Sequence, residues 1–138
     1  MTTQTIRKSI FLAADPTKVW DHLTKSELLE KWFHPSEADL AEGEEYTLLA
    51  ERGGDRMCWG KVEAMDPVTY MRWAFTVKPL NGHMTHVEWR LAPVNGGTSL
   101  TLEHSGLPDG AERFGLVLAL DEGWHGFVGA LQKLANEG

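Results

Sequence analysis

The hydrophobic pattern of this chain changes period once, at Pro108-Asp109-Gly110, and this change limits the folds open to it. Before that point, runs rich in Val, Thr, Trp and Tyr are separated by turn signals of Gly, Asn, Asp and Pro, as is typical of antiparallel strands. After it, apolar residues recur at helical spacing. A sheet with one apolar face and a helix with one apolar stripe can bury both against each other. The sequence therefore predicts an α+β fold.

The first third of the chain predicts one strand and two short helices. An opening strand covers 6–14, and it leads into a helix for which Asp15 is a suitable N-cap and Pro16 a suitable first residue. A second short helix begins at Ser26, and Pro35 ends it. A brief strand is expected near residues 38–40. The turn signals then divide the rest into strands near residues 45–52, 57–65, 69–78, 84–93 and 97–105.

Strand alternation gives the predicted sheet an inner face rich in aromatic side chains. Every second residue along three of the strands is apolar and is expected to face the C-terminal helix, whose own apolar stripe is centred on Trp124. Ligand sites are mostly apolar, so these side chains are candidates to line a cavity between sheet and helix. The candidates are Trp73, Phe75, Val87, Trp89, Leu102, His104, Trp124, Phe127, Val128 and Leu131.

Each of these candidates also has a plain structural interpretation. The aromatic rings could simply fill the core. His104 could be a core histidine bonded to a carbonyl or a water, or it could anchor a ligand or act as an acid or base. Both interpretations stay open at the level of sequence.

Three glycines recur in the C-terminal helix, where each costs about 1 kcal/mol relative to alanine. Gly123 lies on the flank of the apolar stripe, where the backbone could approach the sheet. Gly126 and Gly129 lie on the far side, where they are either tolerated or form a flat patch for a second copy of the chain. A homodimer is therefore one expectation.

Composition excludes several classes of function. The formal net charge of −7 opposes a nucleic-acid partner, and the longest apolar runs are too short to cross a membrane. Cys58 is the only cysteine, so we expect a cytoplasmic protein without disulfides. The histidines show no metal-site spacing, and neither nucleotide-binding motifs nor a nucleophile signature is found. We therefore expect no metal, no cofactor and no identifiable catalytic residue.

Several segments carry a resemblance to a known family: "AADPTKVWDHLT", "LLEKWFHP", "GKVEAMDP", "GGTSLTLEHSG" and "EGW…ALQKL". Together they resemble the Hsp90-ATPase-activator-homologue domains of the START-like, Bet v 1-like superfamily. The resemblance covers about Ile6 to Leu134 and implies a helix-grip fold, in a single domain over residues 1–138. Members of the superfamily share a cavity between sheet and helix but differ in what they hold.

Three functions follow as hypotheses. The first is binding of a small apolar molecule, aromatic ones included, in the cavity, as a carrier, sensor or sequestering protein. The second, implied by the resemblance alone, is a chaperone-associated interaction module. The third is an enzyme of the cyclase or hydrolase kind that the superfamily contains, which would depend on His104 or on a carboxylate at the cavity mouth.

Overall fold

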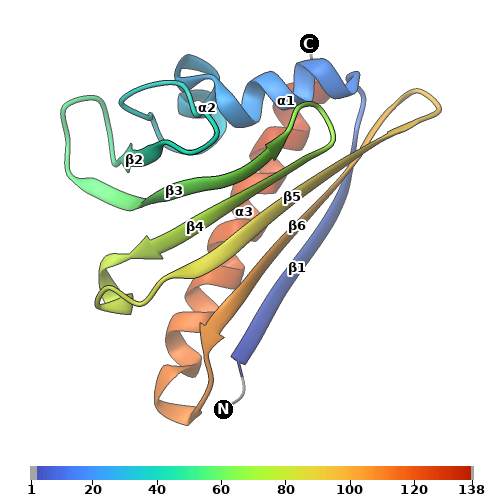
Figure 1. Ribbon diagram of the computed structural model, residues 1–138. Coiled ribbons are helices and arrows are strands. Elements are labelled where there is room, and N and C mark those ends of the chain that lie inside the picture. Colours follow the sequence, from blue (N-terminus) through green and yellow to red (C-terminus); the bar gives the residue numbers. More distant parts are fainter. Residues whose placement is uncertain (1–2, 138) are drawn as a thin grey trace.

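The chain forms one antiparallel sheet with a long C-terminal helix packed across its inner face (Figure 1). The structure is a computed structural model that describes residues 3–137. Two single 3-10 turns, η1 (Lys78–Leu80) and η2 (Ala111–Arg113), lie before β5 and before the long helix. The other elements, in chain order, are β1 (Thr3–Leu12), α1 (Pro16–Thr24), α2 (Ser26–Trp32), β2 (Glu45–Leu49), β3 (Arg56–Asp66), β4 (Tyr70–Val77), β5 (Thr85–Val94), β6 (Gly97–Pro108) and α3 (Phe114–Glu137).

The six strands follow the order β1-β6-β5-β4-β3-β2, so the first strand pairs with the last one and the edges are β1 and β2. Figure 1 shows α3 running diagonally behind the sheet, with α1 and α2 across one end. Helix α3 packs on β1 and on α2. This is the helix-grip arrangement, and the predicted fold class is confirmed.

The local signals of the first helix act as expected. The Asp15 side chain accepts a hydrogen bond from the backbone N–H of Lys18, and Pro16 is the first residue of α1. An N-cap of this kind contributes about 1 kcal/mol. The cap fixes the point at which the chain passes from β1 into α1. A single residue, Lys25, separates α1 from α2.

The brief strand expected near residues 38–40 is wrong. Ser36 instead forms an isolated bridge with Leu48, and the backbone N–H of Leu40 bonds to the carbonyl of Thr24 at the end of α1. The backbone of this segment thus makes single hydrogen bonds to different neighbours, and it does not form the ladder of a strand. The last strand extends further than expected, to Pro108, because β1 continues to pair with it there.

The predicted inner face is confirmed by burial. Trp73, Val87 and Trp89 are fully buried, as is His104, and α3 buries the stripe around Trp124 against them. Phe127 is only partly buried and packs at the margin of the core. Strand alternation thus predicted which side chains point inward.

Candidate functional site

The interior between sheet and helix is filled by aromatic rings. The Trp73 and Trp89 rings lie 5.3 Å apart between centroids, and those of Trp89 and Trp124 lie 5.7 Å apart, both edge to face. Trp32 of α2 adds a further edge contact to Trp89 at 6.0 Å. Spacings of this kind are those of packed aromatic pairs. The centre of the molecule is therefore a packed aromatic core.

His104 lies within this core, and both of its ring nitrogens have protein partners. The indole N–H of Trp124 donates to Nδ1 over 2.9 Å, and Nε2 lies 2.7 Å from the hydroxyl of Thr85. Because an indole nitrogen can only donate, Nδ1 carries no proton and Nε2–H donates to Thr85. The Thr85 hydroxyl in turn donates to the carbonyl of Phe75 over 2.7 Å.

This hydrogen-bond chain fixes the ionisation of His104. Burial, with a smaller contribution from His86, lowers the pKa of His104 to about 3. Protonation of Nδ1 would also place two donors opposite each other at Trp124. The imidazole is therefore neutral, and it holds the indole of Trp124 in place.

An apolar pocket of about 210 Å³ lies beside this core, between the middle of α3, the residues after α2 and the neighbouring ends of β3 and β4. Burial raises the pKa of the Cys58 thiol well above its usual range, so this side chain is an uncharged part of the wall. The lining consists of Phe33, His34, Met57, Cys58, Phe75, Val77, Ala119, Leu120, Gly123, Trp124 and Phe127.

The end of α2 supplies one side of the pocket. Phe33 is the C-cap, with φ −129° and ψ −109°, so the chain leaves the helix there. Its ring lies 4.6 Å from that of Phe127 and 5.3 Å from that of Trp124. The His34 ring lies 5.2 Å from Phe127. The turn after α2 therefore brings two rings against α3.

Gly123 supplies the opposite side. A Cβ atom placed there would meet only the Phe127 ring, at 4.0 Å. The prediction that this backbone closely approaches the sheet is therefore wrong. The missing side chain at Gly123 leaves room in the pocket instead. At Gly126 and Gly129 a Cβ would meet nothing within 4 Å, which agrees with their predicted place on the outside.

The pocket opens into a wider groove. The two share Met57, Val77, Ala119 and Leu120, and the groove adds the side chains of Asp55, Arg56, Trp59, Lys78, Pro79 and Leu116. The guanidinium of Arg56 lies 3.6 Å from the centroid of the Trp59 ring, as in a cation–π contact. The charged side chains therefore lie in the groove, outside the apolar pocket.

Three of the ten candidates from the sequence, Phe75, Trp124 and Phe127, line this pocket. The structure places the others in the buried interior beside the pocket. These are Trp73, Val87, Trp89, Leu102, His104, Val128 and Leu131.

The remaining lining residues were missed, although two signals pointed toward them. Gly123 stood out on the flank of the helical stripe, and Phe33 stood in the "LLEKWFHP" segment. Neither signal shows that the two residues line the same pocket. That arrangement depends on the direction in which the chain leaves α2.

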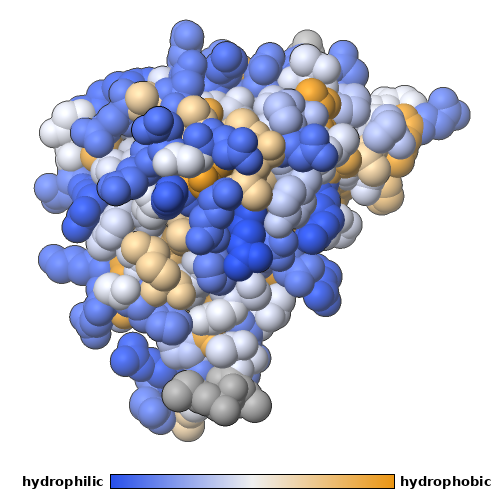
Figure 2. All heavy atoms as spheres, viewed as in Figure 1, coloured by the Kyte–Doolittle hydropathy of each residue, from blue (hydrophilic) through white to orange (hydrophobic). Residues whose placement is uncertain are grey.

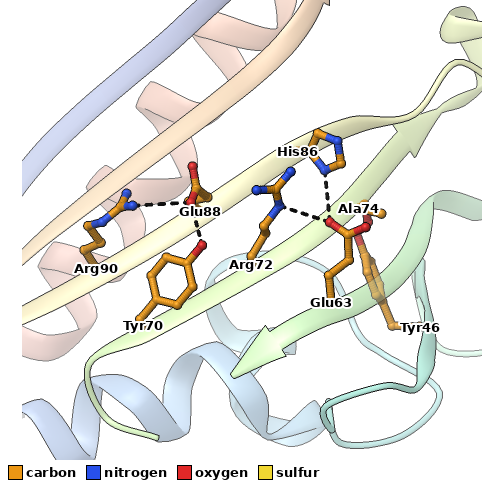
Figure 3. Close-up of polar contacts among 8 residues, drawn as sticks. All are labelled: Tyr46, Glu63, Tyr70, Arg72, Ala74, His86, Glu88 and Arg90. Atoms are coloured by element: carbon orange, nitrogen blue, oxygen red, sulfur yellow. Dashed lines mark hydrogen bonds and ion pairs between the residues drawn. The ribbon is translucent and has the colours of Figure 1, made fainter. Parts of the chain in front are cut away.

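The outer face of the sheet carries ion pairs rather than a site (Figure 3). Glu63 accepts hydrogen bonds from Arg72 over 3.1 Å and from His86 over 3.0 Å. Glu88 accepts from Tyr70 and Arg90. Figure 2 shows this face to be largely hydrophilic. The pairs agree with a solvated surface.

Residues 3–137 contain no group of three or more His, Cys, Asp or Glu side chains placed to hold a metal ion. Within the same range, no helix combines the length and apolar character needed to cross a bilayer.

The sequence profile of the family described as "Activator of Hsp90 ATPase homolog 1-like protein" matches residues 13–136. The chain belongs to this family. The resemblance found from the sequence motifs is thereby confirmed. No curated protein matches the chain in a sequence comparison.

Solved structures share the fold of this family member. Protein MLL2253 from Mesorhizobium loti is 24% identical, with a TM-score of 0.79 over 95% of this chain and 96% of that one. The Aha1 dimer from Colwellia psychrerythraea gives 20% identity and a TM-score of 0.80 over 96% of each chain. Protein BH1534 from Bacillus halodurans gives 24% and 0.78 over 99% of this chain and 100% of that one. At these identities the likeness shows the fold alone.

Proposed function

We propose that this chain acts as a single START-like domain that binds a small apolar molecule, aromatic ones included, as a carrier, sensor or sequestering protein. The observation that carries the proposal is the apolar pocket beside α3, which the absence of a side chain at Gly123 leaves open. Aromatic and aliphatic walls with few polar groups are typical of small-molecule sites.

The size of the pocket limits the ligand. Its volume of about 210 Å³ exceeds the roughly 150 Å³ of a cavity that holds benzene and falls below the roughly 300 Å³ at which drug-sized sites begin. We therefore expect a ligand of one or two rings. A longer molecule would extend past Met57 and Leu120 into the groove.

A matched pair of glycine substitutions tests this proposal. Gly123→Leu places a side chain into the pocket, whereas Gly115→Leu places the same side chain on the outside of the same helix, at an exposed position where a Cβ meets nothing within 4 Å. Calorimetric titration with naphthalene should show binding to the wild type and to Gly115→Leu, and at least tenfold weaker binding to Gly123→Leu. Both variants remove a helical glycine, so their melting temperatures should be similar and no lower than that of the wild type.

Two results would refute the proposal. One is a wild type that does not bind naphthalene at its solubility limit. The other is equal affinity of the two leucine variants, since a ligand in the pocket cannot share its space with the side chain that Gly123→Leu introduces.

The family description favours a second candidate function, a chaperone-associated interaction module. It predicts that the protein stimulates the ATPase of a purified Hsp90-type chaperone. An unchanged ATPase rate at micromolar protein would remove this candidate. The enzyme alternative named His104 or a carboxylate at the cavity mouth. The ring of His104 does not line the pocket, and no carboxylate lines it either, since Asp55 belongs to the groove outside. No observation therefore favours this alternative.

Self-association and a cytoplasmic location complete the proposal. The outer side of α3 around Gly126 and Gly129 leaves open space for a second copy of the chain, and one relative of the same fold is described as a dimer. Sedimentation velocity should show a dimer that Gly126→Glu converts to monomer. A wild type that is monomeric at high concentration contradicts the dimer.

A further inference from the structure

His34 differs from every other side chain that lines the pocket. The indole N–H of Trp124 already donates a hydrogen bond to His104, and the thiol of Cys58 is buried and uncharged. The other lining side chains carry no nitrogen or oxygen. Within residues 3–137, the ring nitrogens of His34 make no hydrogen bond. His34 is thus the one lining side chain with hydrogen-bonding capacity to offer a ligand.

The surroundings of His34 determine what it can offer. Its ring packs against Phe33 and Phe127, with centroids 4.7 and 5.2 Å away. Burial lowers its pKa from the ordinary value, so the imidazole is neutral at pH 7. A neutral imidazole has one donor and one acceptor nitrogen. It can therefore bond a hydroxyl in either direction.

The pocket disfavours a charged ligand group. None of the lining side chains is a lysine, an arginine or a carboxylate, and a charge without a partner is costly in an apolar site. The cationic side chains of Arg56 and Lys78 belong to the groove outside. An uncharged polar group is the one that His34 can satisfy.

We propose that His34 is the specificity-determining residue of this pocket and selects apolar ligands that carry an uncharged hydroxyl, such as a phenol. This inference rests on the proposed function, because it concerns the same pocket. The ligand has a body of one or two rings, held by Phe33, Trp124 and Phe127, and one hydroxyl that bonds to the imidazole. Hydrocarbons of the same shape bind more weakly, and carboxylates do not gain from the histidine.

Three matched probes separate these classes: naphthalene, 2-naphthol and 2-naphthoate. Each is titrated calorimetrically at pH 7.5 into the wild type and three variants. His34→Phe keeps a ring but removes both nitrogens, and His34→Gln keeps a donor and an acceptor. His125→Phe makes the first change at an exposed histidine of α3 that does not line the pocket.

The wild type and His125→Phe should bind 2-naphthol about five- to tenfold more tightly than naphthalene, the range expected for one hydrogen bond. In His34→Phe the preference should fall to about twofold or less while naphthalene affinity is kept. His34→Gln should restore part of the preference, and this partial rescue distinguishes the lost hydrogen bond from a change of pocket shape.

The outcomes separate this inference from the function on which it rests. Naphthalene binding with an unchanged 2-naphthol preference in His34→Phe overturns the role of His34 and leaves the pocket in place. Tighter binding of 2-naphthoate than of 2-naphthol also overturns it, and assigns recognition to Arg56 or Lys78 in the groove. Absence of binding by any of the probes overturns both proposals.

Discussion

The hydrogen-bond chain through His104 predicts a loss of stability in mild acid that one substitution should remove. The ring is fully buried, and its Nδ1 accepts from Trp124. Replacement by asparagine, His104→Asn, places an amide oxygen close to the position of Nδ1. The variant keeps an acceptor for the indole, but it cannot take up a proton.

The size of the effect follows from the two pKa values. In the folded state the pKa of His104 is about 3, whereas in the unfolded chain it is about 6.5. Between these values the unfolded chain binds a proton that the folded one does not, so stability falls as pH falls. The contribution is fully present above pH 6.5 and is lost toward pH 3. From pH 6 to pH 4 the loss is about 2–3 kcal/mol.

Urea unfolding at pH 7, 6, 5 and 4 measures this contribution. At pH 7, His104→Asn should be less stable than the wild type by about 1–3 kcal/mol, because it loses the bond to Thr85 and leaves a small void. Between pH 6 and pH 4, the variant should lose about 2–3 kcal/mol less than the wild type. His125→Asn, at an exposed site, should follow the wild type. Equal pH slopes for the wild type and His104→Asn would refute the assigned tautomer and burial.

Two further predictions concern the pairing of β3 with β4 and the wall of the pocket at Cys58. Gly60→Ala should lower the unfolding free energy by about 1–3 kcal/mol in urea titrations, because its Cβ would lie 1.9 Å from the carbonyl oxygen of Ala74. As a control, Gly126→Ala, whose Cβ meets no neighbour within the chain, should raise the unfolding free energy by about 1 kcal/mol. An unchanged unfolding free energy in Gly60→Ala would contradict the pairing of β3 with β4. Cys58 should react slowly with a thiol reagent at pH 8 in the folded protein and rapidly in urea, because burial raises its pKa. Rapid labelling of the folded protein would show that this wall of the pocket is open.

The fold could be predicted because it depends on periodicity. Alternation along β5 fixed the inward direction of Val87 and Trp89, and the helical stripe fixed that of Trp124 and Leu131. A shift of one residue would have turned each strand's side chains to the other face. These assignments need only the order of residues along one element.

The site could not be predicted in the same way, because it depends on distances between elements. Alternation places His104 inside but cannot show that Trp124 and Thr85 occupy both of its nitrogens. The direction of the chain at Phe33, which brings His34 to α3, is set by one unusual pair of backbone angles after α2. Asp121 of α3 forms an ion pair with Lys8 of β1 at 2.8 Å, a contact between residues far apart in the sequence.

The separation between the pocket and the tryptophan core has a consequence for how this scaffold can change. Met57 and Ala119 are exposed and Val77 and Leu120 are half-buried, so none of these four pocket walls belongs to the buried interior. Substitutions at such positions usually cost little stability. Randomising them should give a library in which most members fold but differ in the molecules they accept. Ligand preference can thus diverge at the rim while the aromatic interior, on which folding depends, is inherited unchanged.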